Sequence, residues 1–130
     1  LLMREFYANF AGEEEVAETI GNFFEEYDYP LDPHTAVAVA VHNGYVCETG
    51  DSGPTVILST ASPYKFPESV LRAMDVNFDG DSFVAAEKLE EETAVPVPAQ
   101  IARLKTLPVR FTAKAAPDDL LDAVLAFIGE

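Results

Sequence analysis

Positive charge is scarce in this sequence. Its 130 residues hold 8 Lys and Arg against 23 Asp and Glu, which gives a formal net charge of −15. Between Arg4 and Lys65 there is no Lys or Arg at all. Proteins that bind nucleic acids neutralise phosphates with clustered Lys and Arg. The composition therefore argues against a nucleic-acid partner.

Cysteine is nearly absent too, since Cys47 is the only one. A lone cysteine cannot form an internal disulfide, and no Cys/His cluster has the spacing of a zinc site. The two histidines, His34 and His42, are too far apart on one expected helix to chelate a metal together. We therefore expect a protein of the reducing cytoplasm with no bound metal.

Long apolar runs and the common glycine motifs are also missing. The longest apolar run is interrupted by His34 and His42 and is too short to span a bilayer, and the first residues lack the order of a signal peptide. The seven glycines are scattered and form no GxGxxG or P-loop, and there is no GxSxG or HExxH motif. We expect no membrane partner and none of the enzyme classes that these motifs mark.

What the sequence does contain is a series of helical patterns. With 48% hydrophobic and 24% charged residues, it has the composition of a globular domain or of a piece of a larger one. We treat residues 1–130 as a single segment. Apolar spacing and capping residues predict helices over 13–27, 33–50, 68–74 and 82–93, a short one around 101–107 and a last one from 117 to 128.

The second of these helices has a clear start signal. Asp32 is well placed as the N-cap and Pro33 as the first helical residue, where its missing N–H costs nothing. His34 and Thr35 then lie in the first turn, where free N–H groups and the helix dipole favour an anion. A purely structural role for His34, packing or capping there, remains open beside anion binding.

Residues 55–60 have the pattern of a strand. The run TVILST is short, continuous and β-branched, which is typical of a strand buried on both faces in the parallel sheet of an α/β protein. A polar turn and a helix follow, and in open α/β sheets ligands bind at the carboxyl ends of strands. We predict a helix-rich α/β fold with few parallel strands, a possible edge segment over 108–112, and a site at residues 60–65.

Lys65 stands in that turn as an isolated cation in an acidic chain. Its ammonium group could hold an anion or a carboxylate beside the strand end. A solvated surface lysine is the alternative, and for a lone lysine it is the commoner case.

Two motifs resemble the carboxyl-terminal part of the threonine synthase family. Residues 32–37 read DPHTAV, and residues 60–67 read TASPYKFP. The family has D-P-H-T-A-V followed, some twenty-odd residues later, by T-A-[SH]-P-x-K-F-P. The order and separation agree, and the resemblance extends over essentially the whole chain, with weaker specificity beyond about residue 75.

The resemblance implies a pyridoxal 5'-phosphate enzyme of the tryptophan-synthase-β-like fold, fold type II. Such an enzyme converts O-phosphohomoserine and water to threonine and phosphate. In this fold a Ser or Thr hydroxyl meets the pyridine nitrogen of the cofactor, and motif position assigns that role to Thr60, with Ser62 as the second candidate. His34 and Lys65 are then candidates for the substrate pocket.

The family's Schiff-base lysine and its glycine-rich cofactor-phosphate loop have no counterpart in these residues, so no catalytic residue is assigned here. We therefore expect a carboxyl-terminal fragment that is inactive alone, whose partner is the missing N-terminal portion of the enzyme, and which self-associates through an exposed apolar face. Two other readings stay open. One is an autonomous acidic interaction domain without catalysis, and the other is a fragment of another fold type II lyase.

Overall fold

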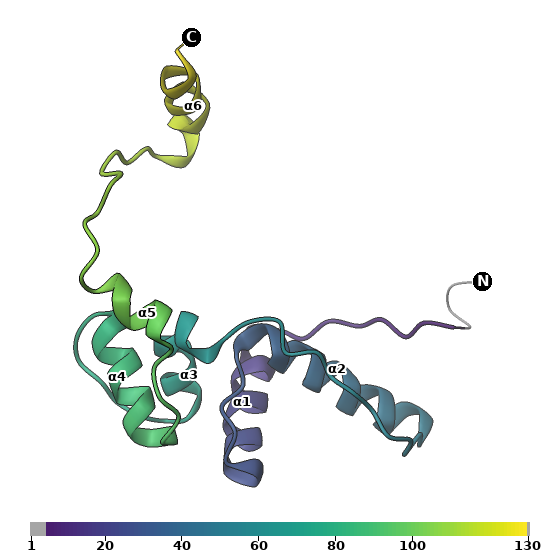
Figure 1. Ribbon diagram of the computed structural model, residues 1–130. Coiled ribbons are helices and arrows are strands. Elements are labelled where there is room, and N and C mark those ends of the chain that lie inside the picture. Colours follow the sequence, from purple (N-terminus) through teal and green to yellow (C-terminus); the bar gives the residue numbers. More distant parts are fainter. Residues whose placement is uncertain (1–4, 130) are drawn as a thin grey trace.

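The computed structural model describes residues 5–129, and this part of the chain is built from helices joined by irregular segments (Figure 1). No residue between 5 and 129 lies in a β-strand. The elements in chain order are α1 (Glu13–Tyr27), α2 (Pro33–Thr49), the 3-10 turn η2 (Pro63–Lys65), α3 (Pro67–Ala73), α4 (Ser82–Thr93), α5 (Ala99–Leu104), the 3-10 turn η3 (Pro117–Asp119) and α6 (Leu120–Ile128).

The helix predictions are confirmed, with boundaries that agree to within a few residues. Helix α2 starts after Asp32, whose side chain accepts hydrogen bonds from the first turn, and ends at Gly50, which adopts the left-handed conformation with φ of 71°. Asp81 caps α4 in the same way as Asp32 caps α2. These start and stop residues are the ones that local backbone chemistry favours, because they satisfy N–H and C=O groups that the helix itself leaves free.

The core lies where α1 packs against α2 and α3, and where α3 packs against α4. Its buried side chains come from all four of these helices, from η2 and from the segment before α2. They are Ile20, Leu31, Ala36, Val39, Tyr64, Val70, Leu71, Ala85, Ala86 and Leu89. Helices α1 and α3 approach closely at Gly21, where an added Cβ would lie 2.6 Å from the carbonyl oxygen of Ala73. Only a hydrogen fits at this crossing, so the glycine sets how closely the two helices pack.

Residues 55–60 do not form a strand in the described chain, so this prediction is wrong there. The segment lies against α2 and shares a groove with its side chains, yet Val56 is 86% exposed and Leu58 is 75% exposed. A strand exists only when a neighbouring strand takes up its backbone N–H and C=O groups. None of the residues 5–129 provides that neighbour, and residues 108–112 are likewise irregular and exposed. The helix-rich part of the predicted fold class is confirmed, whereas its parallel strands are not found.

The carboxyl-terminal part lies apart from the other helices. An irregular segment leads from α5 to η3 and α6, and α6 stands well away from α1 to α5 (Figure 1). The apolar side chains of α6 are largely exposed. Among residues 5–129, no helix combines the length and the hydropathy that crossing a membrane requires.

Candidate functional site

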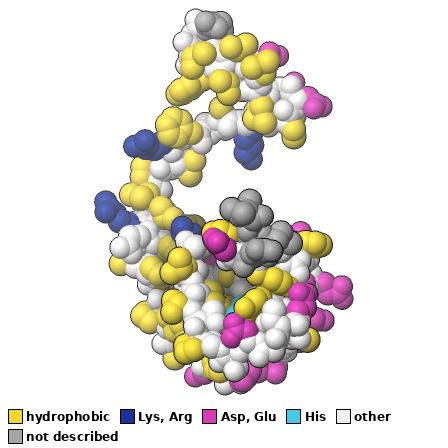
Figure 2. Space-filling view, turned by 90° about the vertical axis from the view of Figure 1, so that its right-hand side faces the viewer, with side chains coloured by type: hydrophobic (Ala, Val, Ile, Leu, Met, Phe, Trp, Pro, Cys, Tyr) yellow, Lys and Arg dark blue, Asp and Glu magenta, His cyan; other side chains and the backbone are white. Residues whose placement is uncertain are grey.

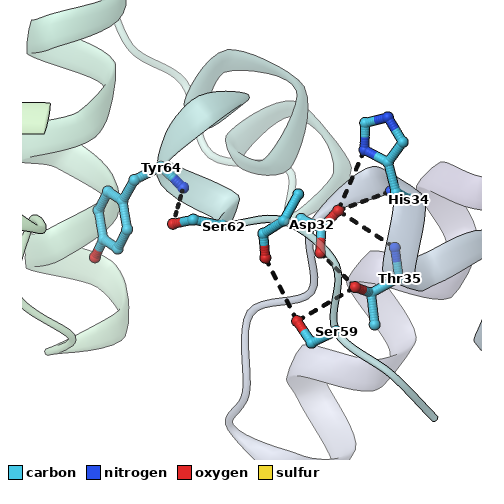
Figure 3. A network of polar contacts seen from close by, with 7 residues as sticks. Asp32, His34, Thr35, Ser59, Ser62 and Tyr64 are labelled. Carbon is cyan, nitrogen blue, oxygen red and sulfur yellow. Dashed lines mark hydrogen bonds and ion pairs between the residues drawn. The ribbon is translucent and has the colours of Figure 1, made fainter.

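A polar cluster joins the start of α2 to residues 59–61, which come after the end of that helix (Figure 3). Asp32 is 1% exposed and its Oδ1 accepts hydrogen bonds from the backbone N–H groups of His34, at 2.9 Å, and Thr35, at 3.3 Å. Its other oxygen accepts from the Thr35 hydroxyl. Thr35 Oγ1 also lies 3.4 Å from Ser59 Oγ, which in turn donates to the Ala61 carbonyl at 3.4 Å. Thr35 thus links the buried carboxylate of Asp32 to residues 59–61.

Hydrogen bonding decides the ionisation of Asp32. Burial by itself raises the pKa of a carboxyl group. The hydroxyl and N–H of Thr35, with the N–H and imidazole of His34, outweigh burial and lower the pKa of Asp32 below its usual value. Asp32 is therefore a buried carboxylate that stays charged at neutral pH.

His34 is held at its Nδ1 by this carboxylate. Nδ1 lies 3.3 Å from Asp32 Oδ1, and the ring packs on Phe66 with 5.1 Å between centroids. The side chain is 61% exposed, and Figure 3 shows the other ring nitrogen pointing away from Asp32. A neutral histidine that donates from Nδ1 keeps the Nε2 lone pair for an outside partner. This pairing gives His34 a fixed orientation.

His34 lines a cleft of about 750 Å³ between the start of α1, the start of α2 and α3. The polar side chains of the cleft are Glu13, Glu14, His34, Ser69 and Arg72, and its remaining lining is apolar. The first-turn N–H groups of α2 do not serve as an anion site here, because Asp32 already accepts from two of them. The backbone N–H groups of His34 and Thr35 are therefore used to cap the helix. The imidazole of His34 is exposed and remains available to a ligand.

Ser62 and Tyr64 fix the turn that precedes α3. Ser62 Oγ accepts a hydrogen bond from the Tyr64 N–H at 3.3 Å and so caps η2. The Tyr64 side chain is 4% exposed, and its hydroxyl donates to the Val95 carbonyl and lies 3.4 Å from Thr93 Oγ1. Burial raises the pKa of Tyr64, which keeps this hydroxyl protonated as a donor. The turn is thereby anchored to the end of α4.

Thr60 and Lys65, the other two residues predicted for the site, are both exposed. Within residues 5–129 their side chains take part in no hydrogen bond or ion pair with a described partner. The structure thus joins His34 to a polar cluster and Ser62 to a turn, while Thr60 and Lys65 face outward. The cofactor role of Thr60 and Ser62 and the substrate role of His34 and Lys65 stay predictions.

Sequence reasoning missed two features of this region. Ser59 falls within the predicted strand, yet its hydroxyl contacts Thr35. Arg72 falls within a predicted helix, yet it also lines the cleft beside His34. Neither residue carries a local sequence signal, because both features depend on residues distant in sequence. In the described residues, no three His, Cys, Asp or Glu side chains come close enough together to hold a metal ion.

Known proteins resemble a large part of this chain. Residues 35–128 match the family described as "Threonine synthase, C-terminal". Human "Threonine synthase-like 2" and the "Threonine synthase" of Pseudomonas aeruginosa are each 41% identical over 61 residues, which is 47% of this chain and 13% of either relative. The "Threonine synthase" of Saccharomyces cerevisiae is 33% identical over 95 residues, which is 68% of this chain and 18% of that protein.

The matched residues therefore cover less than a fifth of the length of these relatives. The family match nevertheless covers well over half of the chain. It extends from the first turn of α2 to the last residue of α6. On this evidence the chain belongs to the threonine synthase family, as a carboxyl-terminal piece of it.

Proposed function

We propose that this chain is the carboxyl-terminal portion, residues 1–130 together, of a pyridoxal-phosphate-dependent threonine synthase. That enzyme would convert O-phosphohomoserine and water to threonine and phosphate. The observation that carries the proposal is the family match over residues 35–128. A biosynthetic enzyme of this kind would work in the cytoplasm, which agrees with a chain whose lone cysteine, Cys47, is a free thiol.

Thr60 and Ser62 are the residues of this chain that could contact the pyridine nitrogen of the cofactor. Thr60 is exposed, and no described side chain occupies its hydroxyl, so it is free to meet the pyridine nitrogen. Ser62 fits less well because its Oγ already accepts from the Tyr64 N–H. When bound, the cofactor supplies an electron sink for the reaction at the substrate. We assign no Schiff-base role to Lys65, which stands in a turn rather than beside the pocket that a cofactor lysine needs.

The chain's own residues would contribute binding and orientation. The exposed ammonium group of Lys65 is suited to the phosphate of the substrate, and His34, oriented by Asp32, offers Nε2 to a polar ligand group. The Asp32–Thr35–Ser59 cluster would position both motifs, because it links the start of α2 to the residues just before Thr60. These contacts would orient the substrate. The residues that make and break bonds would belong to the rest of the enzyme.

The segment over residues 55–60 would become a strand in that enzyme, which would give the complete protein the parallel sheet of fold type II. Its β-branched composition and the exposure of Val56 and Leu58 support this, because both would be buried by flanking strands and helices. Residues 5–129 contain no partner strand, and under this proposal the neighbouring strands belong to the rest of the enzyme.

A chimera tests the proposal. Residues 1–130 would replace the corresponding carboxyl-terminal region of the P. aeruginosa threonine synthase, and phosphate release from O-phosphohomoserine would be measured. We expect activity that Thr60→Val lowers at least about tenfold, together with a changed cofactor absorbance spectrum, because Val keeps the shape and removes the hydroxyl.

Thr55→Val is the matched control, since it makes the same change at the other, exposed end of the same segment. The 130-residue chain alone should release no phosphate. A chimera that folds, binds pyridoxal phosphate and yet releases none would refute the proposed reaction, and equal activity of the two Thr variants would remove Thr60 from the site. Activity with a different amino-acid substrate would favour another fold type II lyase.

A further inference from the structure

Residues 105–129 form a carboxyl-terminal arm whose apolar side chains lie open. Figure 2 shows hydrophobic atoms over much of the upper part of the molecule, where α6 lies, while acidic side chains gather on the lower part. Leu121 is 69% exposed and Phe127 is 82% exposed. The other exposed apolar side chains of the arm are Leu107, Val109, Phe111, Leu120, Val124 and Ile128.

The pattern of α6 indicates a face made for burial. Its large apolar residues fall on one side of the helix, whereas Asp122, Ala123 and Ala126 fall on the other. The helix has nine residues, and an isolated helix of fewer than about 12 residues is marginal in water. The stability of α6 must therefore come from a surface that covers its apolar side.

Charge separates the arm from the rest of the molecule. Residues 105–129 hold three basic and three acidic residues, whereas residues 5–104 hold four basic and 19 acidic ones. The arm is thus neutral and apolar, and the helices α1 to α5 carry the acidity. A face of this kind matches an apolar surface with little net charge, which the acidic helices do not offer.

The family match indicates what provides that surface. The match runs to residue 128, so α6 is part of the domain that family members share and is not a tail appended to it. The matched residues make up only 13% to 18% of these relatives, so most of their length lies outside the region matched.

We propose that the apolar face of the arm docks on the part of the threonine synthase polypeptide that lies outside this domain, on a surface that is apolar and weakly charged. The proposal rests on the proposed function. Leu121 and Phe127, the most exposed large apolar residues of α6, would contact that surface. The irregular stretch before η3 connects α6 to the helices α1 to α5 (Figure 1).

The first test uses the 130-residue chain alone. Amide hydrogen exchange should be close to unprotected throughout α6, while the amides around Leu71 and Leu89 should be strongly protected, and these results should not depend on protein concentration. Protection of α6 in a monomer would mean that the arm packs on its own chain. Protection that rises with concentration would mean that a second copy covers it, and either result overturns the proposal.

The second test uses the chimera with the P. aeruginosa enzyme. We expect α6 amides to exchange at least about 100-fold more slowly than in the chain alone. The double variant Leu121→Ser, Phe127→Ser should lose that protection, whereas the control Ala123→Ser, Ala126→Ser, on the opposite side of α6, should keep it.

Exchange and activity separate the two proposals. A chimera that protects α6 but releases no phosphate keeps the docking and rejects the reaction. An active chimera in which α6 exchanges as fast as in the chain alone rejects the docking and keeps the reaction. A chimera that does not fold leaves the decision to the first test, which needs only the chain itself.

Discussion

The helical body, residues 5–104, buries many of its apolar side chains within the chain. The carboxyl-terminal arm, residues 105–129, leaves most of its apolar side chains exposed. In the body, Leu71 and Leu89 are fully buried between helices of the same chain. In the arm, Leu121 and Phe127 lie on an equally clear helical stripe and are exposed. Periodicity therefore shows which side of a helix is apolar, but only the surrounding structure decides what covers it.

The largest expected effect contrasts one leucine from each region. Leu89→Ala should lower the free energy of unfolding by about 2–5 kcal/mol, because it removes a fully buried side chain and leaves a cavity. Leu121→Ala in the arm should change it by less than about 0.5 kcal/mol in the chain alone. Urea denaturation of both variants measures the difference, and equal losses would abolish the distinction between body and arm.

Two glycines sharpen the description of the body. Gly21→Ala should destabilise by about 1–3 kcal/mol, because the new Cβ would meet the Ala73 carbonyl oxygen at 2.6 Å. Gly44→Ala in α2 is the control, since its Cβ would meet nothing closer than the Tyr7 hydroxyl at 3.9 Å, and it should stabilise by up to about 1 kcal/mol through helix propensity. Thermal unfolding should show shifts of opposite sign, and two shifts of the same sign would contradict the close α1–α3 crossing.

Two N-caps compare a buried carboxylate with an exposed one. Asp32→Ala should cost about 1–3 kcal/mol, because it removes the cap and leaves the buried Thr35 hydroxyl with only the long contact to Ser59 as an acceptor. Asp81→Ala, at the exposed start of α4, should cost about 1 kcal/mol from the lost cap alone. Denaturant titrations would rank the two, and an equal cost would mean that the Asp32 cluster acts as no more than an ordinary cap.

The smallest effect concerns pH and again belongs to the body. Because the pKa of Asp32 is lowered in the folded chain, its contribution to stability is complete above the unfolded value of 3.8 and is lost as the pH falls through the lower folded value. Unfolding free energies measured between pH 6 and about pH 3 should therefore decline less steeply in Asp32→Asn than in the parent chain. A parallel decline would assign the acid sensitivity to other carboxylates.

Capping residues and apolar spacing predicted the helices of the body well. They did not predict features that depend on a partner distant in sequence. The caps Asp32, Gly50 and Asp81 act through their own neighbours in sequence, so the helices that they bound could be predicted. A strand depends on residues distant in sequence, so the composition of residues 55–60 indicated an extended segment but not what would pair with it. At the candidate site, the capping role of Asp32 was predictable, whereas the contact of Thr35 with Ser59 joins residues 24 positions apart and carried no local signal.

The close crossing at Gly21 also determines how this part of the protein moves. With the Ala73 carbonyl oxygen filling the space that a side chain would need, α1 cannot turn about its axis without bringing Ile20 or Asn22 against α3. Because α1 packs against both α2 and α3, we expect these three helices to move together when the region that surrounds His34 is displaced, with any hinge in the irregular segments outside them.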